Sequence, residues 1–390
     1  MFRISRFQQL MQQVPRGTFQ TLIERHGADR YTKGFGCLEL LTAQVFGHLS
    51  GSRSLRELET AYNAHPAQHY HLGTGPIRRS TLADACARRT PTVFEELASL
   101  LMATAHRTVR RSVQAGLLLL DSTSLTLKGR GYDAWTQSQR TRHTQGLKLH
   151  VLYDHGTGTP VAQEITAANV NDVTQGARMP LRRGETYVFD KGYCDYAWWA
   201  RFDAHQAFFI TRLKRNARVA RVEARAIPEA DRATILDDEV VRFSNPSPRG
   251  GRGHRYTAPV RRITVDRPDK PTPLVLVTND LTRPAADIAA GYKARWQIEL
   301  FFKWIKQNLK IKSFYGRSEN AVRIQILCAL IAYLLVALHR QLHATGTSML
   351  RVLNRLRAGL FQRPDSDAAV DRRRRQRQRT LDAVQPRLFA

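Results

Sequence analysis

Apolar residues recur at helical spacing through the first part of the chain. The segments CLELLTAQVFGHLSG and SRSLRELETAYN place apolar side chains three and four positions apart, which is typical of amphipathic helices. The segment RRSTLADACARRTPTVFEELASLL then predicts two more helices. We therefore predict an all-helical N-terminal domain over residues 1–113.

The first helix of that last segment is short and has basic ends. Arg78 and Arg79 precede it, and Arg88 and Arg89 follow it. A short helix with such ends suits a DNA-binding unit of the helix-turn-helix kind. An ordinary bundle helix with basic ends fits the pattern equally well, and both interpretations stay open here.

The pattern changes to strands near residue 114. GLLLLDSTSLTLKG indicates a buried strand, and GLKLHVLYDHGTGTPVAQEIT indicates two strands joined by a Gly-containing turn. ETYVFDKGYCDYAWWARFDAHQAFFITRLK indicates a strand, a loop, a helix and another strand. Hairpin strands followed by strand, helix and strand predict an α/β domain, of which 114–213 is the first part.

Three further regions follow this α/β segment. Four short strand-like segments, separated by Pro, Gly and Arg, predict a β-rich insertion over 214–285. Helical spacing returns over 286–345, which we interpret as the second part of the α/β domain. Residues 346–390 form a basic C-terminal tail containing DRRRRQRQR, either an arm on phosphates or a solvated charge block.

The most apolar segment predicts a buried helix and no membrane association. Ile326–Leu338 is thirteen residues long, whereas a membrane-spanning helix needs about twenty. The first residues carry no continuous apolar run, so we expect no signal peptide. The four cysteines form no CxxC pair, which argues against a zinc knuckle and a disulfide scaffold. A reducing cytosol fits these features.

The charge of the chain points to nucleic acid. Lys and Arg number 61 against 33 Asp and Glu, a net charge of +28. A surplus of this size repels itself unless a polyanion is near. A merely basic, solvated surface is the alternative, and the spread of the charge over the whole chain argues against it.

One helix combines a core-facing stripe with an isolated carboxylate. Between Asp287 and Glu319 the only acidic residue is Glu299, among seven Lys and Arg residues. A helix over Gly291–Lys310 places Ala294, Ile298, Phe301, Ile305 and Leu309 on one side, and Tyr292, Arg295, Glu299 and Lys306 on another. Salt bridges at i,i+4 explain one Glu but not the surplus of cations. Phosphates would balance that surplus while the carboxylate holds a metal ion.

Two strand-borne carboxylates are the natural partners of Glu299. Asp121 and Asp190 end or interrupt the apolar runs LLLLD and TYVFD, where an unpaired carboxylate is costly. If the two strands are neighbours, both side chains emerge at the same edge of the sheet. Asp154, in a turn, and Asp172, near a helix start, are weaker candidates. The sequence lacks HExxH, GxSxG, P-loop and GxGxxG motifs.

These residues together resemble a known family. The chain is similar to bacterial cut-and-paste DDE transposases of the insertion sequence 4 family, whose Tyr-Arg-Glu-Lys pattern is matched by Tyr292, Arg295, Glu299 and Lys306. Asp121 in DSTSL and Asp190 in DKGY match the first and second acidic motifs. The order of the motifs, with a β-rich insertion before the Glu, is also that of the family.

The resemblance implies a fold, a cofactor and a reaction. We expect an RNase H-like catalytic domain with two Mg²⁺ ions, replaceable by Mn²⁺, held by Asp121, Asp190 and Glu299. Water would attack the phosphodiester at the end of the element and free a 3′-hydroxyl. In relatives this hydroxyl forms a hairpin on the opposite strand before insertion. Tyr292 and the two cations of the pattern would hold phosphates.

The same resemblance implies partners and leaves alternatives. Double-stranded DNA is expected at terminal inverted repeats and at the target, with a homodimer on DNA in the bacterial cytoplasm, associated with the nucleoid. Trp296 could stack on a displaced base or pack in the core, and we favour packing. Two rival functions are an RNase H-like nuclease without strand transfer and an inactive, DNA-binding repressor. The Tyr-Arg-Glu-Lys row disfavours the first, and the three acids disfavour the second.

Overall fold

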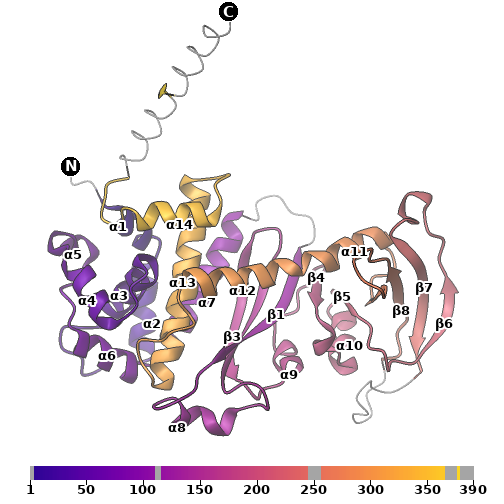
Figure 1. Ribbon diagram of the computed structural model, residues 1–390, viewed down its shortest axis with the longest axis horizontal. Helices are drawn as coiled ribbons and strands as arrows, with labels where there is room; N and C mark the ends of the chain where they lie inside the picture. The colour runs from indigo at the N-terminus through magenta and orange to yellow at the C-terminus, as the bar shows by residue number, and fades with distance from the viewer. Residues whose placement is uncertain (1–3, 110–115, 245–255, 365–375, 378–390) are drawn as a thin grey trace, which may run out of the picture. The chain divides into compact units, whose positions relative to one another are not determined.

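The chain is a mixed α/β protein in two compact units (Figure 1). The computed structural model describes residues 4–109, 116–244, 256–364 and 376–377. One unit combines Met1–Leu101 with Asn308–Ala390, and the other is Met102–Gln307. The division differs from the predicted one, because the chain beyond Asn308 joins the helices of the N-terminal region. Most of the DRRRRQRQR segment lies outside the described residues.

The first unit is built from helices. The structure has helices and no strand within residues 4–109. Their bounds are α1 Arg6–Met11, α2 Arg16–Arg25, α3 Cys37–Ser50, α4 Leu55–Asn63, α5 Pro66–Leu72 and α6 Arg79–Arg88, and α7 Thr92–Val109 runs on into the second unit. From the other end of the chain come α13 Glu319–His343 and α14 Met349–Arg357. Apolar helical faces from both ends of the sequence thus share one core.

Helix α13 is the buried core helix that its composition predicts. By length and composition it could cross a membrane, with a hydropathy of 2.3 in its most apolar window, but 94% of that window is buried inside the protein. It packs on α3 and α6. The imidazole of His48 on α3 contacts the carbonyl oxygens of Leu309 (2.7 Å) and Gln325 (3.0 Å). Burial lowers the pKa of His48 to about 4, so the ring is neutral and its single N–H donates to one of these two carbonyls.

One nine-stranded sheet organises the second unit. The strand order is β3-β2-β1-β4-β5-β9-β8-β7-β6. Strand β4 runs parallel to both β1 and β5, and the other neighbouring pairs are antiparallel. The bounds are β1 Leu117–Thr126, β2 Gly146–Asp154, β3 Thr159–Ala167, β4 Thr186–Phe189, β5 Phe208–Arg212, β6 Val219–Ala224, β7 Ile235–Phe243, β8 Val260–Val265 and β9 Leu274–Thr278. Short helices α8 Asp133–Thr136 and α9 Asp172–Gly176 lie in the connections.

The four strands predicted for residues 214–285 are present and extend the same sheet. Strand β9 pairs with β5, with Ile210 opposite Thr278, and β8, β7 and β6 follow outward. Without β9, strand β5 would leave its hydrogen-bonding edge unpaired. The region is therefore an insertion in sequence but a continuation of the sheet in space.

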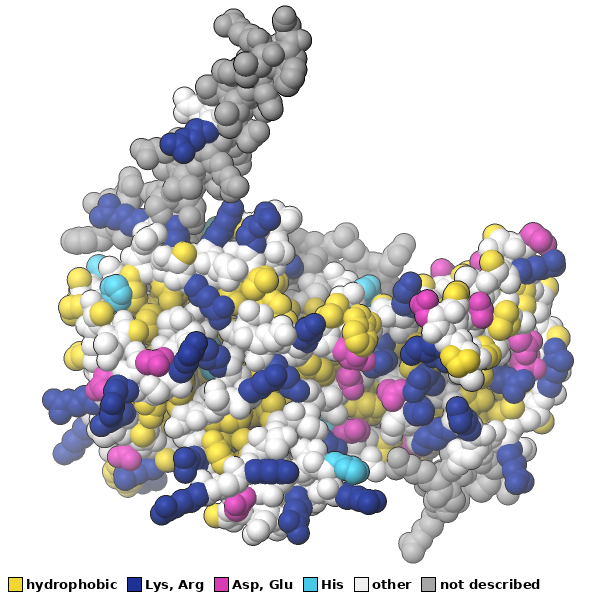
Figure 2. Space-filling view, in the orientation of Figure 1, with side chains coloured by type: hydrophobic (Ala, Val, Ile, Leu, Met, Phe, Trp, Pro, Cys, Tyr) yellow, Lys and Arg dark blue, Asp and Glu magenta, His cyan; other side chains and the backbone are white. Residues whose placement is uncertain are grey.

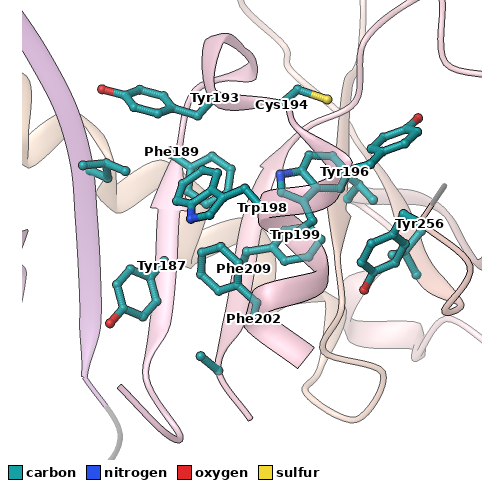
Figure 3. Packing of buried hydrophobic residues seen from close by; sticks show 14 of the residues in the cluster. Tyr187, Phe189, Tyr193, Cys194, Tyr196, Trp198, Trp199, Phe202, Phe209 and Tyr256 are labelled. Carbon is teal, nitrogen blue, oxygen red and sulfur yellow. The ribbon is translucent and has the colours of Figure 1, made fainter. Parts of the chain in front are cut away.

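An aromatic core supports the strand that leads to Asp190 (Figure 3). Phe189, the last residue of β4, packs on Trp198 of α10 (Tyr196–Ala204) with ring centroids 4.8 Å apart. Trp199 of the same helix stacks on Phe209 of β5 at 4.7 Å. Rings of this size dominate core energetics and fix the backbone around them. The end of β4 is thus rigidly placed.

The predicted helix over Gly291–Lys310 is two helices. Helix α11 is Ala285–Ala294, α12 is Trp296–Asn308, and Arg295 forms the turn between them. The prediction of one uninterrupted helix was therefore wrong, although Arg295 keeps right-handed helical angles. Ile298, Phe301 and Ile305 are buried as expected, whereas Ala294 is only half-buried.

Candidate functional site

Asp121 and Asp190 lie side by side at one place in the sheet. In the parallel pairing of β1 and β4, Leu120 is opposite Phe189. Asp121 is the next residue of β1, and Asp190 directly follows β4. The two strands are neighbours, so the condition set by the sequence is met.

Glu299 joins this pair through Arg295. The Nη2 atom of Arg295 donates to Oε1 of Glu299 at 2.6 Å, and its Nη1 lies 3.8 Å from Oδ2 of Asp121. One guanidinium thus contacts a carboxylate from the sheet and a carboxylate from α12. The i,i+4 pair expected from helix spacing is present, and it bridges to the sheet as well.

A second arginine, which the sequence did not single out, contacts the remaining carboxylate. The Nη2 atom of Arg212, at the end of β5, lies 3.3 Å from Oδ1 of Asp190. Tyr292 is buried near both arginines: burial raises the pKa of its phenol, and the charges of Arg212 and Arg295 partly lower it. Three acidic and two guanidinium groups therefore share one site.

The pKa of Asp121 reflects its burial and the charges around it. Burial raises the pKa of Asp121 to about 6. The backbone N–H of Ser122, at 2.8 Å, and the charge of Arg295 lower it, while Glu299 and Asp190 raise it. Asp121 thus senses both other carboxylates. In Figure 2, acidic side chains lie close together near the junction of α11 and α12, with Lys and Arg beside them.

Carboxylates suit a divalent cation, but these three are not arranged as a preformed metal site. Among the residues that the structure describes, no group of three or more His, Cys, Asp or Glu side chains is placed to hold a metal ion. Carboxylate oxygens are nevertheless the ligands that Mg²⁺ and Mn²⁺ prefer. Burial first, and then its two negative neighbours, disfavour the charged form of Asp121, and a nearby cation would favour that form.

The two competing aspartates have other partners. Asp154 accepts backbone N–H bonds from Gly156 and Thr157, as expected of a turn residue, and lies 3.0 Å from the His106 imidazole. Asp172 is the first residue of α9, and Asn171 caps that helix instead. The carboxylate of Asp172 contacts Lys148 and accepts a bond from the Ser122 hydroxyl, each at 3.1 Å.

The predicted DNA contacts on α12 have different surroundings. Lys306 donates to the backbone oxygen of Ser124 at 3.3 Å. Trp296 is 57% exposed, so the packing role that we favoured for it was wrong. Its indole lies on the outer side of a helix whose apolar stripe already faces the core, which leaves it open to a partner.

The four arginines around α6 divide into two groups. Arg78, Arg79 and Arg88 are exposed. Arg89 instead pairs with Asp29 at 3.0 Å and donates to the carbonyl of Phe35. Its side chain is only 10% exposed. The expectation that Arg89 contacts DNA is therefore not supported, because this guanidinium holds a loop of its own unit.

A basic cavity next to Asp190 was also missed by sequence reasoning. Its volume is about 860 Å³, and its wall runs from the end of β4 to the turn before β9. Besides Asp190, its charged lining residues are Lys191, Arg212, Lys214, Arg215 and Arg267. The run RLKR in the sequence was the available signal. Five cations against one acid make this cavity suitable for a polyanion.

Comparison with known proteins gives a consistent result. Residues 114–335, more than half of the chain, match the family described as "Transposase DDE domain", and residues 3–75 match "Domain of unknown function (DUF4372)". "Putative transposase y4zB" of Sinorhizobium fredii is 43% identical over 75% of this chain and 79% of its own length. "Probable transposase for insertion sequence element IS5377" of Geobacillus stearothermophilus is 25% identical over 76% and 80%.

Among solved structures, the piggyBac transposase synaptic complex with hairpin DNA matches with a TM-score of 0.45 and 10% identity. The match covers 90% of this chain and 77% of that one.

Carboxylates that share a site with arginines, in a chain whose family match is a transposase DDE domain, indicate an enzyme that acts on DNA. The chain belongs to the family of transposase DDE domains. It is a DNA transposase, and its family comprises metal-dependent enzymes that cleave DNA.

Proposed function

We propose that this protein is the cut-and-paste transposase of an insertion sequence, in the insertion sequence 4 branch with the Tyr-Arg-Glu-Lys signature. Asp121, Asp190 and Glu299 are its metal-binding catalytic residues. The observation that carries this proposal is the convergence of two strand-borne aspartates, in register, with a helix-borne glutamate through Arg295. The name of the Geobacillus stearothermophilus relative, a probable transposase for an insertion sequence element, supports the insertion-sequence assignment.

The strand arrangement supports an RNase H-like catalytic domain. The sheet begins β3-β2-β1-β4-β5, with β2 antiparallel to β1 and with β4 parallel to both β1 and β5. This order is that of the RNase H-like fold, with Asp121 on its central strand. Glu299 follows the β-rich extension in the sequence and lies on helix α12.

The metal is proposed to be a pair of Mg²⁺ ions, with Mn²⁺ as a substitute. When bound, the ions would activate a water or hydroxyl and neutralise charge on the leaving oxygen, so no histidine base is needed. The two aspartates and Glu299 would hold them. The site's own cations would orient the phosphodiester, because guanidinium and ammonium groups bind phosphate oxygens well.

The DNA is proposed to run across this site. Tyr292 lies on α11, Arg295 in the turn and Lys306 on α12, and the basic cavity is lined by Asp190. Exposed Arg78, Arg79 and Arg88 on the helical unit are proposed contacts to terminal inverted repeats. Since two ends and a target must meet, we propose a homodimer on DNA, in the bacterial cytoplasm at the nucleoid.

The experiment that tests this function separates cleavage from joining. Purified protein, Mg²⁺, a target plasmid and duplexes of the inverted repeats flanking the gene should give both cut ends and ends joined to the target. Cut ends alone would favour the rival nuclease without strand transfer. Bound but uncut DNA would favour the inactive repressor. Asp190→Asn should abolish both products.

A further inference from the structure

Two arginines contact the three carboxylates of the acidic site and offset part of their charge. Arg295 contacts Glu299 at 2.6 Å and Asp121 at 3.8 Å, and Arg212 contacts Asp190 at 3.3 Å. Each of the three carboxylates therefore has a guanidinium partner. No metal-binding role accounts for these pairs, because arginine is always protonated and cannot be a ligand.

The two arginine side chains are partly exposed to solvent. The side chain of Arg295 is 19% exposed and that of Arg212 is 32% exposed. Tyr292 lies close to both, since each guanidinium charge lowers the pKa of its phenol. Arg212 also lines the basic cavity. Its guanidinium can therefore contact either Asp190 or a phosphate bound in that cavity.

The same carboxylate oxygens cannot serve two cations equally well. A divalent ion close to Arg295 or Arg212 would be repelled by the guanidinium charge in a half-buried site. Phosphate, like a carboxylate, can accept two hydrogen bonds from the guanidinium fork of arginine. An incoming DNA backbone can therefore compete for the arginines and leave the carboxylates to metal ions.

We propose that Arg212 and Arg295 take the place of the metal ions in the DNA-free enzyme, and that DNA phosphates draw them away, so that DNA and metal strengthen each other's binding. This inference rests on the proposed function. It rests on the contacts of Arg295 with Asp121 and Glu299 and of Arg212 with Asp190. It makes the transposase a poor metal binder, and hence a poor nuclease, until DNA is in place.

The coupling is reciprocal by thermodynamic linkage. If DNA tightens metal binding by some factor, the metal tightens DNA binding by the same factor, typically about 5–150-fold. The opposite arrangement would have the arginines orient the carboxylates as supports behind them, as outer partners do in many metal sites. In that case removing an arginine would weaken metal binding.

Calorimetric titration of the full, DNA-free chain with Mn²⁺ distinguishes these arrangements. Arg295→Gln and Arg212→Gln should each bind Mn²⁺ about tenfold more tightly than the unmodified protein. Arg323→Gln is the matched control, because Arg323 forms an i,i+4 pair with Glu319 at 2.8 Å, outside the site. That control should bind Mn²⁺ as the unmodified protein does.

A second measurement needs no variant. Affinity of the unmodified protein for an inverted-repeat duplex, at constant ionic strength, should rise about tenfold on adding Mn²⁺. Unchanged or weaker Mn²⁺ binding by both arginine variants, or a Mn²⁺-independent DNA affinity, would overturn the inference while leaving the acidic site intact. If, with the end duplex present, Mn²⁺ binds as well to Glu299→Gln as to the unmodified protein, the proposed function itself fails.

Discussion

Asp121 lies directly beside Asp190, one residue beyond the paired Leu120 and Phe189 of two parallel strands. This register brings together two carboxylates that are far apart in the sequence, and the aromatic packing on Phe189 keeps the second one in place. A one-residue slip of either strand would turn one carboxylate to the opposite face of the sheet. The acidic site is therefore a direct product of strand pairing.

Removing the charge of Glu299 should separate binding from chemistry. Glu299→Gln keeps the shape and leaves the site's cations in place, so DNA binding should persist. Cleavage should fall by about 1000-fold or more, since metal stabilisation of the transition state is worth several kcal/mol. Gel assays of binding and nicking check this. Glu319→Gln, which removes the other i,i+4 pair, should nick normally. Unchanged nicking by Glu299→Gln would mean that another carboxylate binds the metal.

Neutralising Asp121 should stabilise the metal-free protein at neutral pH. The folded state raises the pKa of Asp121 from its usual 3.8 to about 6. Between these values the folded state binds more protons than the unfolded state, so the free energy of unfolding falls as pH rises through this window. Asp121→Asn removes that loss and should gain up to about 3 kcal/mol above pH 6.

Urea unfolding in the presence of a chelator checks this. The gain should shrink towards zero near pH 4, where the carboxyl is protonated in both states. A variant no more stable than the unmodified protein at pH 7 would contradict the burial of a charged Asp121.

Lys306 should contribute one phosphate contact. Lys306→Ala should weaken binding to the end duplex and reduce the slope of log affinity against log salt by about one unit. Lys306→Arg keeps the charge and should keep the slope. Equal slopes for the alanine variant and the unmodified protein would show that Lys306 touches no phosphate.

The cationic side chains of the basic cavity should also contact DNA phosphates. Lys191 and Arg215 are exposed at its wall. Alanine at either position should lower the salt slope by about one unit. Arg232, an exposed arginine paired with Glu229, is the control and should have no effect. If Lys191→Ala and Arg215→Ala behave like Arg232→Ala, the DNA does not pass over this cavity.

Replacing Trp296 should affect DNA binding and leave the free energy of unfolding nearly unchanged. Because its side chain is 57% exposed, Trp296→Ala should change the free energy of unfolding by less than about 0.5 kcal/mol. Ile298 lies on the buried stripe, so Ile298→Ala should lower the free energy of unfolding by about 2–5 kcal/mol. If the indole stacks on a base, Trp296→Ala also weakens end binding by about 1–3 kcal/mol. A large stability loss would restore the packing interpretation.

Local patterns were sufficient for the strands, for most helices and for the places of Asp121 and Asp190 at the ends of apolar runs. The run LLLLD predicted a buried strand, and the Asp at its end drew attention because a buried, unpaired carboxylate is costly. The stripe Ile298, Phe301 and Ile305 predicted the buried face of α12 because helical periodicity is a local property.

Contacts between distant segments could not be predicted in this way. Arg89 looked like the other arginines beside α6, but its partner Asp29 lies on another segment. Arg212 ends an ordinary strand pattern, and only the pairing of β4 with β5 brings it to Asp190. The break at Arg295 escaped prediction because neither Pro nor Gly marks it.

The central claim is that Asp121, Asp190 and Glu299 bind the same metal ions. Anomalous scattering from Mn²⁺, in crystals of the protein with its end duplex, locates the ions directly. Mn²⁺ should be bonded to oxygens of all three side chains, with Asp121 and Asp190 contributing from adjacent strands. Mn²⁺ bound elsewhere, with these carboxylates still paired to Arg295 and Arg212, would contradict it.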